Sequence, residues 1–199
     1  MAKKQRGIMG RSDIPLAQRL QMQRNADIVG IRQQSAKAIM FCTSVALHEL
    51  EGIGYKLLVK FALRFKEIND EFYEDPVVGM VHAKHRMQDM GMPISGELFT
   101  VPSGGRNAQL QNHSLQASQI AQICGAIAMN DVLKLGKTRQ FRVSERVNEL
   151  SARYALEGMD FLLEQMRKIG FVVVDGEVRA WLDDDGKPVT QKKAKELGL

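Results

Sequence analysis

Residues 35–76 decide the fold of this chain: SAKAIMFCTSVALHELEG (35–52) leads directly into IGYKLLVKFALRFKEINDEFYEDP (53–76). In the first part, apolar residues occupy most of the helical circumference, which is typical of a helix in the centre of a bundle. The second part has one apolar face, formed at helical spacing by Leu58, Phe61, Ala62, Phe65, Ile68 and Phe72. We therefore predict two helices that meet at Gly52 and Gly54.

Two further helices are expected around this pair. Before it, Pro15 marks the first turn of a helix that Ser12 or Asp13 would cap. The apolar stripe of this helix is so thin that we expect it on the surface or against a partner. After the pair, residues 77–90 form a shorter helix with Met80, Ala83, Met87 and Met90 on one face. Methionine suits an irregular core, so we assign this face to the core.

The C-terminal half is expected to supply two more helices and a hairpin. Residues 107–130 contain no Asp, Glu, Lys or Arg, which indicates a helix covered on most sides, either by the bundle or by a second subunit. After a basic linker at 134–142, Ser144 is the expected cap of a long helix that Gly170 ends. Asp175-Gly176 between two β-rich runs then predicts a β-hairpin.

These elements predict a mainly α fold, a bundle of about five to six helices with a small C-terminal β-hairpin. A short strand near 94–101 is a candidate partner of the hairpin. We predict a flexible basic arm at 1–12, a single helical domain at 13–182 and a basic C-terminal tail at 183–199.

The positive charge is concentrated at the N-terminus. The chain has a net charge of +5, yet residues 1–40 alone hold eight basic and two acidic residues. Arg and Lys bind phosphates, and Gln and Asn can pair with adenine, so this part is a candidate nucleic-acid surface. The residues expected to bind are Lys3, Lys4, Arg6, Arg11, Arg19, Arg24 and Arg32. A solvated helical face that only aids solubility is the alternative explanation.

The helix after Gly54 has an unusual order of charges on its outer face. The cations come first and the carboxylates last, whereas the helix dipole favours the opposite order. An antiparallel copy or partner helix would place acid opposite base, although salt screening also makes an accidental order harmless. The candidate partner-binding residues are Lys56, Lys60, Arg64, Glu67 and Glu71.

Catalytic and metal-binding patterns are incomplete, so we expect no metal and no cofactor. No His has a Glu three residues before it, and His48-Glu49 lacks the second His of a zinc helix. An Mg²⁺-dependent nucleotide hydrolase remains an alternative, with carboxylates from Glu67, Asp70, Glu71 and Glu74 joined by Glu49 and Glu51. A ribonuclease using Arg106 and His113 is a further one.

The main hypothesis is therefore a non-enzymatic, oligomeric helical protein that contacts nucleic acid through its basic N-terminal arm and helix. A protein-binding regulator or inhibitor that acts through the face of residues 56–74 is the alternative. The sequence lacks a signal peptide and an apolar run long enough to cross a membrane. Cys42 and Cys124 both lie in apolar helical stretches, as buried thiols of a reducing compartment do, so we expect a cytoplasmic protein.

Overall fold

The computed structural model describes residues 15–94, 105–180, 187–189 and 191–196. The elements in these ranges are α1 (Leu16–Glu51), α2 (Tyr55–Glu74), α3 (Pro76–Asp89), α4 (Arg106–Leu133), α5 (Lys137–Glu157), α6 (Met159–Lys168), β1 (Val172–Val174), β2 (Glu177–Arg179) and α7 (Gln191–Glu196). The prediction of a mainly helical fold with a small C-terminal hairpin is confirmed. None of the described helices combines the length and the hydropathy that crossing a membrane requires.

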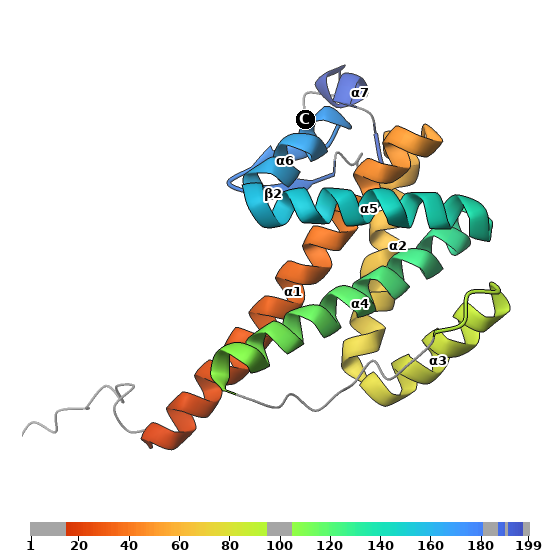
Figure 1. Ribbon diagram of the computed structural model, residues 1–199. Helices are drawn as coiled ribbons and strands as arrows, with labels where there is room; N and C mark the ends of the chain where they lie inside the picture. The colour runs from red at the N-terminus through yellow and green to blue at the C-terminus, as the bar shows by residue number, and fades with distance from the viewer. Residues whose placement is uncertain (1–14, 95–104, 181–186, 190, 197–199) are drawn as a thin grey trace, which may run out of the picture.

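Helix α1 is the axis around which the other helices are arranged. It contacts α4 and α5 most extensively, and α2 and α6 as well. Figure 1 shows α5 crossing the C-terminal part of α1, while α4 runs beside both α1 and α2. Helix α3 turns back from the end of α2 and lies against α2 and α4.

Helix α1 is longer than the sequence suggested. The helix expected after Pro15 and the apolar helix expected from residue 36 form one continuous helix of 36 residues. The prediction that the helix after Pro15 is separate from the helix of residues 36–52 is wrong. No residue between the two breaks the helix, and the exposed Gly30 is tolerated within it. Helix α1 ends as expected at Gly52, whose left-handed backbone (φ 63°) lets its N–H bond to the carbonyl of His48.

The core is built from the faces that the periodicity indicated. Residues 41–47 of α1 are all buried, and so are five of the six predicted apolar positions of α2, with Ala62 half-buried. Met80, Ala83 and Met87 of α3 are buried too, which confirms that the methionine face belongs to the core. Between α2 and α3, Asp75 caps the start of α3. Its Oδ1 accepts hydrogen bonds from the backbone N–H groups of Val77 and Val78, both at 3.1 Å.

The prediction of one long helix from Ser144 to Ile169 is wrong. Helix α5 begins seven residues earlier, at Lys137, so most of the expected basic linker is helical and Ser144 is an exposed residue inside the helix. Gly158 then divides the segment, because its backbone (φ 81°, ψ −171°) is neither helical nor accessible to a residue with a Cβ. Helix α6 restarts at Met159 and buries Phe161, Leu162, Leu163 and Met166.

The C-terminal hairpin matches its prediction. Strands β1 and β2 pair antiparallel, with Val173 opposite Val178. Asp175 and Gly176 both have positive φ (52° and 75°), as a two-residue hairpin turn requires. The candidate strand near 94–101 and the arm at 1–12 lie almost entirely outside the described residues, so these two predictions and the domain boundaries remain predictions.

Candidate nucleic-acid interface

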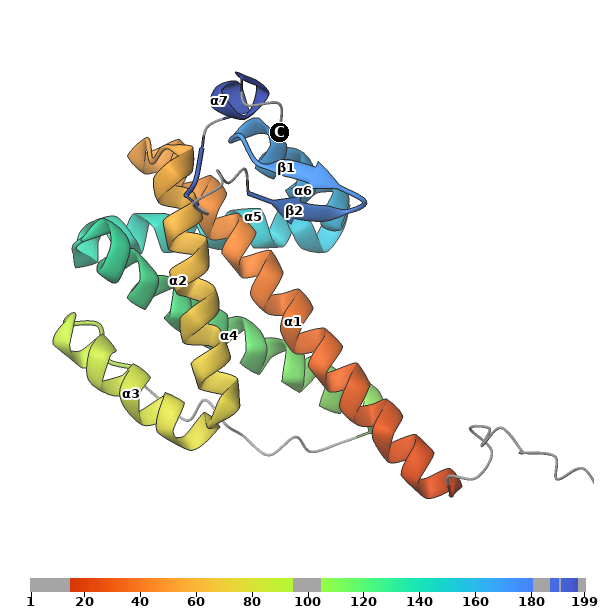
Figure 2. The ribbon, with the colours of Figure 1, turned by 180° about the vertical axis from the view of Figure 1, so that it is seen from behind.

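The N-terminal part of α1 extends away from the bundle. Residues 16–34 are here called the projecting segment, and the first turns of this segment extend past the start of α4 (Figure 2). Residues 16–26 are exposed all around the helix, whereas burial of α1 begins at Ala36. Within the projecting segment, Asp27 and Ile28 lie beside the first turns of α4, and Arg32 and Gln34 at its base contact α2 and α5. A helix end without covering neighbours leaves its side chains free for a ligand.

Of the predicted nucleic-acid-binding residues, the structure describes three. Arg19 and Arg24 lie on the projecting segment and are exposed. Arg32 is half-buried, and its guanidinium lies 5.1 Å from the centre of the Tyr73 ring of α2, in a cation–π contact. Lys3, Lys4, Arg6 and Arg11 lie outside the described residues. The structure therefore places two of these side chains in solvent and ties the third to the bundle.

Seven arginines elsewhere in the chain are paired with carboxylates, although Arg179 of β2 takes part in none of the ion pairs among the described residues. Arg139 and Arg142 of α5 bind Glu51 at the end of α1, and the next turn places Arg146 Nε 2.8 Å from Glu49 Oε2. Further pairs are Arg64 and Arg86 with Asp131, Arg153 with Glu157 and Arg167 with Glu164. By contrast, Arg19 and Arg24 take part in none of the ion pairs among the described residues. Neither arginine is therefore held by an ion pair of this kind, although Asp27 lies one turn from Arg24.

Amide side chains accompany these two arginines on the projecting segment. Gln21 Nε2 donates to Asn25 Oδ1 at 3.2 Å, one turn further along. Gln18 and Gln23 are exposed as well. Gln34, near the base of the segment, instead donates to the hydroxyl of Tyr154 on α5 at 3.2 Å. The exposed amides provide hydrogen-bond donors and acceptors beside positive charge, a combination that can contact both phosphates and base edges.

The charge-ordered face of α2 is only partly free. Lys56, Lys60, Glu67 and Glu71 are exposed, as the partner-binding prediction requires. Arg64, however, points to α4, where its Nε lies 2.9 Å from Asp131 Oδ2, and it also contacts Glu67 at 3.0 Å. Arg64, one of the three cations on this face, therefore already has a partner within the chain.

Asp131 is a structural charge that the sequence reasoning missed. Its carboxylate receives Arg64 from α2 and Arg86 from α3, so it joins three helices. Burial by itself would raise the pKa of Asp131, but the hydrogen bonds from Arg86 and Arg64 outweigh burial and lower it below the ordinary value of 3.8. The only signal in the sequence is position, since Asp131 is the first acidic residue after the uncharged stretch.

Four of the six carboxylates proposed for an Mg²⁺ site are engaged in ion pairs. Glu49 and Glu51 bind arginines of α5, while Glu67 binds Arg64 and Asp70 binds Lys66 at 2.6 Å. Within the described ranges, no group of three or more His, Cys, Asp or Glu side chains could hold a metal ion. The structure thus offers no support for the Mg²⁺-dependent alternative.

The two cysteines are not arranged for catalysis, whereas the ribonuclease alternative stays a prediction because the side chain of Arg106 lies outside the described part of the structure. Cys42 and Cys124 are buried free thiols, and burial raises their pKa to about 11 and about 12, so both remain protonated and poorly nucleophilic at neutral pH. His113 lies half-buried on α4, beside Arg24 and Asp27 of α1. His113 therefore lies next to the candidate nucleic-acid surface of the projecting segment.

Comparison with known proteins finds no matching family model, no similar curated protein and no similar solved structure.

Proposed function

We propose that the protein is a non-enzymatic DNA-binding protein that contacts the duplex with the projecting segment of α1. The observation that carries this proposal is the contrast in charge pairing. Arg19 and Arg24 are exposed without a carboxylate partner among the described residues, whereas three arginines of α5, Arg139, Arg142 and Arg146, are paired with Glu49 and Glu51. Lys3, Lys4, Arg6 and Arg11 precede this segment in the sequence and would add to its positive charge.

Helix geometry favours duplex DNA over duplex RNA as the partner. The major groove of B-form DNA admits an α-helix, while the major groove of A-form RNA is too deep and narrow for side chains to read. Because residues 16–26 are exposed on every side, the segment could enter a groove without moving the bundle. Phosphate contacts by arginine would supply most of the affinity, and the amides would add base contacts.

The decisive experiment measures the affinity for a labelled DNA duplex by fluorescence anisotropy over a range of salt concentrations. We expect the double variant Arg19→Gln/Arg24→Gln to bind about tenfold more weakly at low salt, and the slope of log K against log salt to fall by about 2. The matched control is Arg153→Gln/Arg167→Gln, which removes two arginines that are paired on the bundle. This control should bind as the unaltered protein does.

The proposal fails if binding is absent at low salt, if it does not depend on salt, or if both double variants weaken it equally. A duplex RNA of the same length provides a second comparison. The duplex RNA should bind more weakly than the DNA, because the protein can contact its phosphates but not the base edges in its major groove.

We also infer that the protein assembles as a homo-oligomer. Leu16 and Leu20 lie one turn apart on the projecting segment and are 65% and 52% exposed. A second copy of the chain would cover such side chains and remove apolar surface from water. Light scattering with and without DNA tests this inference: a mass above that of one chain is expected, and Leu16→Gln/Leu20→Gln should lower it. A monomeric mass at high concentration would contradict it.

A protein-binding regulator that uses α2 is the second candidate, supported by the exposure of Lys56, Lys60, Glu67 and Glu71. Charge reversal at Lys56 and Lys60 tests it without disturbing the bundle, whereas reversal at Arg64 would also break its pair with Asp131. Loss of a co-purifying protein partner in Lys56→Glu/Lys60→Glu would support this candidate. Retention of the partner would remove it.

A further inference from the structure

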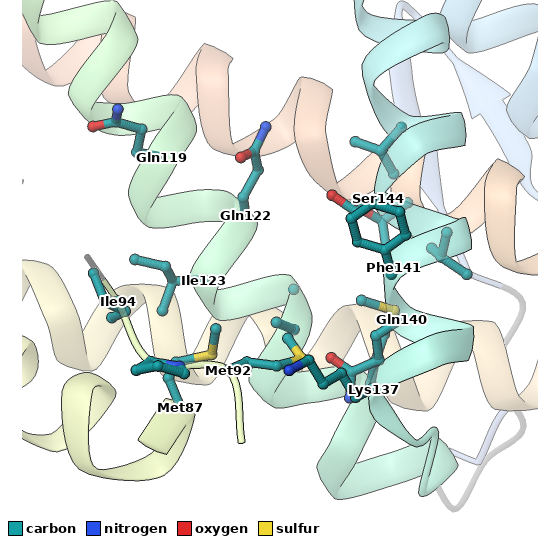
Figure 3. A pocket seen from close by; sticks show the side chains of 17 residues that line it. Met87, Met92, Ile94, Gln119, Gln122, Ile123, Lys137, Gln140, Phe141 and Ser144 are labelled. Carbon is teal, nitrogen blue, oxygen red and sulfur yellow. The ribbon is translucent and has the colours of Figure 1, made fainter. Parts of the chain in front are cut away.

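A pocket of about 400 Å³ lies between α3, α4 and α5 (Figure 3). Figure 1 shows the end of α3, the C-terminal half of α4 and the start of α5 on the side of the bundle away from the N-terminal end of α1. Small-molecule sites in proteins usually have volumes of about 300–1,000 Å³ and mostly apolar walls with a few polar groups. The walls here are mostly apolar and come from the end of α3, the C-terminal half of α4 and the first turns of α5. Both the size and the lining are those of a binding site for a small molecule.

Three methionines from separate segments give this pocket its character. Met87 lies in the last turn of α3, Met92 follows that helix and Met129 belongs to α4. Thioether sulfurs make favourable contacts with aromatic rings, and methionine side chains adapt to the shape of a ligand. Phe141 of α5 lies at the rim with 64% of its surface exposed, which adds an aromatic face. These side chains favour an aromatic ligand.

The charge of the pocket favours an anion. Among its described lining residues, Lys137 is the only charged one, and none is acidic. Lys137 is also the first residue of α5, so the positive end of the helix dipole lies at the same rim. A carboxylate next to Lys137 would therefore meet two sources of positive potential.

Gln140 supplies a hydrogen-bond acceptor that nothing in the described structure uses. Its side chain is only 3% exposed, and its Nε2 donates to the carbonyl of Leu135 at 2.8 Å, which determines the orientation of the amide. The enclosed Oε1 then has no hydrogen-bond partner among the described residues. Figure 3 shows the Gln140 amide and the Lys137 side chain reaching from α5 toward the methionines. Buried acceptors without partners are rare, because losing water without gaining a hydrogen bond is unfavourable.

We propose that this pocket binds an aromatic carboxylate that carries a ring N–H. The ring would lie among Met87, Met92 and Met129, the carboxylate would bind Lys137, and the ring N–H would donate to Gln140 Oε1. Lys137 and Gln140 are three residues apart on α5 and so lie on the same face of the helix, within reach of one compact ligand. The ligand reaches the enclosed oxygen by displacing methionine side chains, which rotate easily. This site is independent of the DNA-binding proposal.

The test uses the full chain with its methionine methyl groups labelled with ¹³C, titrated with indole-3-acetate and with naphthalene-1-acetate. The two probes have a carboxylate and a bicyclic ring in common, but only the first has a ring N–H. We expect indole-3-acetate to shift the methyl signals of Met87, Met92 and Met129. Met22 on the projecting segment and Met166 of α6, which do not line the pocket, should not shift. Indole-3-acetate should bind about tenfold more tightly than naphthalene-1-acetate.

Two variants assign the polar contacts. Lys137→Met should weaken both probes by about threefold to tenfold, and Gln140→Leu should abolish the preference for indole-3-acetate. Thermal unfolding checks that each variant is folded, and the comparison of the two probes on the unaltered protein does not depend on any variant. The proposal is overturned if the three methyl signals do not move, if only Met22 or Met166 moves, or if the two probes bind equally.

Discussion

Residues 16–26 and residues 36–47 belong to the same continuous helix, yet their surroundings are opposite. The first range is exposed on all sides, while the second contains the best-buried residues of the chain, such as Cys42, Ala46 and Leu47. An isolated helix as short as the first range is only marginally stable in water, because nucleating a helix is costly. The buried half therefore supplies the nucleus, and the projecting segment extends from it. Stability and candidate function are thus divided between two parts of one helix.

The two ends of α1 also differ in how their charged residues are paired. Glu49 and Glu51 in the last turns of α1 hold three arginines of α5, whereas Arg19 and Arg24 at the other end of α1 face solvent. Paired charges help to orient helices, while unpaired arginines can attract a polyanion.

The largest contrast is expected between two apolar truncations in α1. Phe41 is 2% exposed, so Phe41→Ala should lower the free energy of unfolding by about 3–5 kcal/mol through lost burial and a residual cavity. Leu20→Ala removes a side chain that is 52% exposed and should change it by less than about 0.5 kcal/mol. Urea denaturation of both variants provides the measurement. The expectation applies at protein concentrations low enough to keep the chain monomeric, where similar losses at the two positions would contradict the exposed placement of Leu20.

A second contrast concerns two helical glycines. A Cβ at position 79 would lie 2.8 Å from the Cα of Phe72, so Gly79→Ala should destabilise the α2–α3 packing by about 1–3 kcal/mol. A Cβ at Gly30 would meet nothing within 4 Å, and Gly30→Ala should stabilise the protein by about 0.5–1 kcal/mol because alanine is the better helix former. Melting temperatures that move in opposite directions would confirm the contrast. A lower melting temperature for Gly30→Ala would contradict the exposed placement.

A third contrast compares a partly buried ion pair with a surface pair. Asp131→Asn should cost about 1–2 kcal/mol, because Arg64 and Arg86 lose their carboxylate while remaining partly solvated. Glu164→Gln, which breaks an exposed pair with Arg167, should cost less than about 0.5 kcal/mol. Equal costs in denaturant titrations would mean that Asp131 does not join the helices.

The effect of Asp131 should also depend on pH. Because its pKa is lower in the folded protein than the ordinary value of 3.8, the carboxylate stabilises the fold above that value, and this contribution is lost as the pH falls through the folded pKa. The difference in unfolding free energy between the unaltered protein and Asp131→Asn should therefore be constant near neutral pH and shrink in acid. A difference that grows in acid would contradict the sign of the shift.

Much of the fold followed from short-range pattern. The apolar stripe of α2, the methionine face of α3 and the Asp175-Gly176 turn all occur as predicted, because each depends on residues within a few positions of one another. Local pattern does not predict which glycines interrupt a helix. Gly30 and Gly125 lie inside helices while Gly158 breaks one, although all three occur in stretches with helical periodicity. Which glycine becomes a break depends on how the flanking helices pack.

The residue types of the candidate site could be predicted from the sequence, but which of its side chains are exposed could not. The basic N-terminal region and its glutamines are evident in the sequence, and the structure shows Arg19 and Arg24 exposed. Arg32 was grouped with them, but its contact with Tyr73 joins residues far apart in the chain. Arg64 was assigned to an outer face and instead binds Asp131, 67 residues further on. No local pattern indicates either contact.

The helical character of the chain, its C-terminal hairpin and the basic excess at its N-terminus are all evident from the amino-acid sequence, since they depend on the identity of neighbouring residues. Folding is what carries α1 unbroken into solvent, lets Asp131 join three helices and brings Gln140 beside a pocket between α3, α4 and α5. The physical reason is distance along the chain. Charge pairing and cavities arise between residues that only folding brings together.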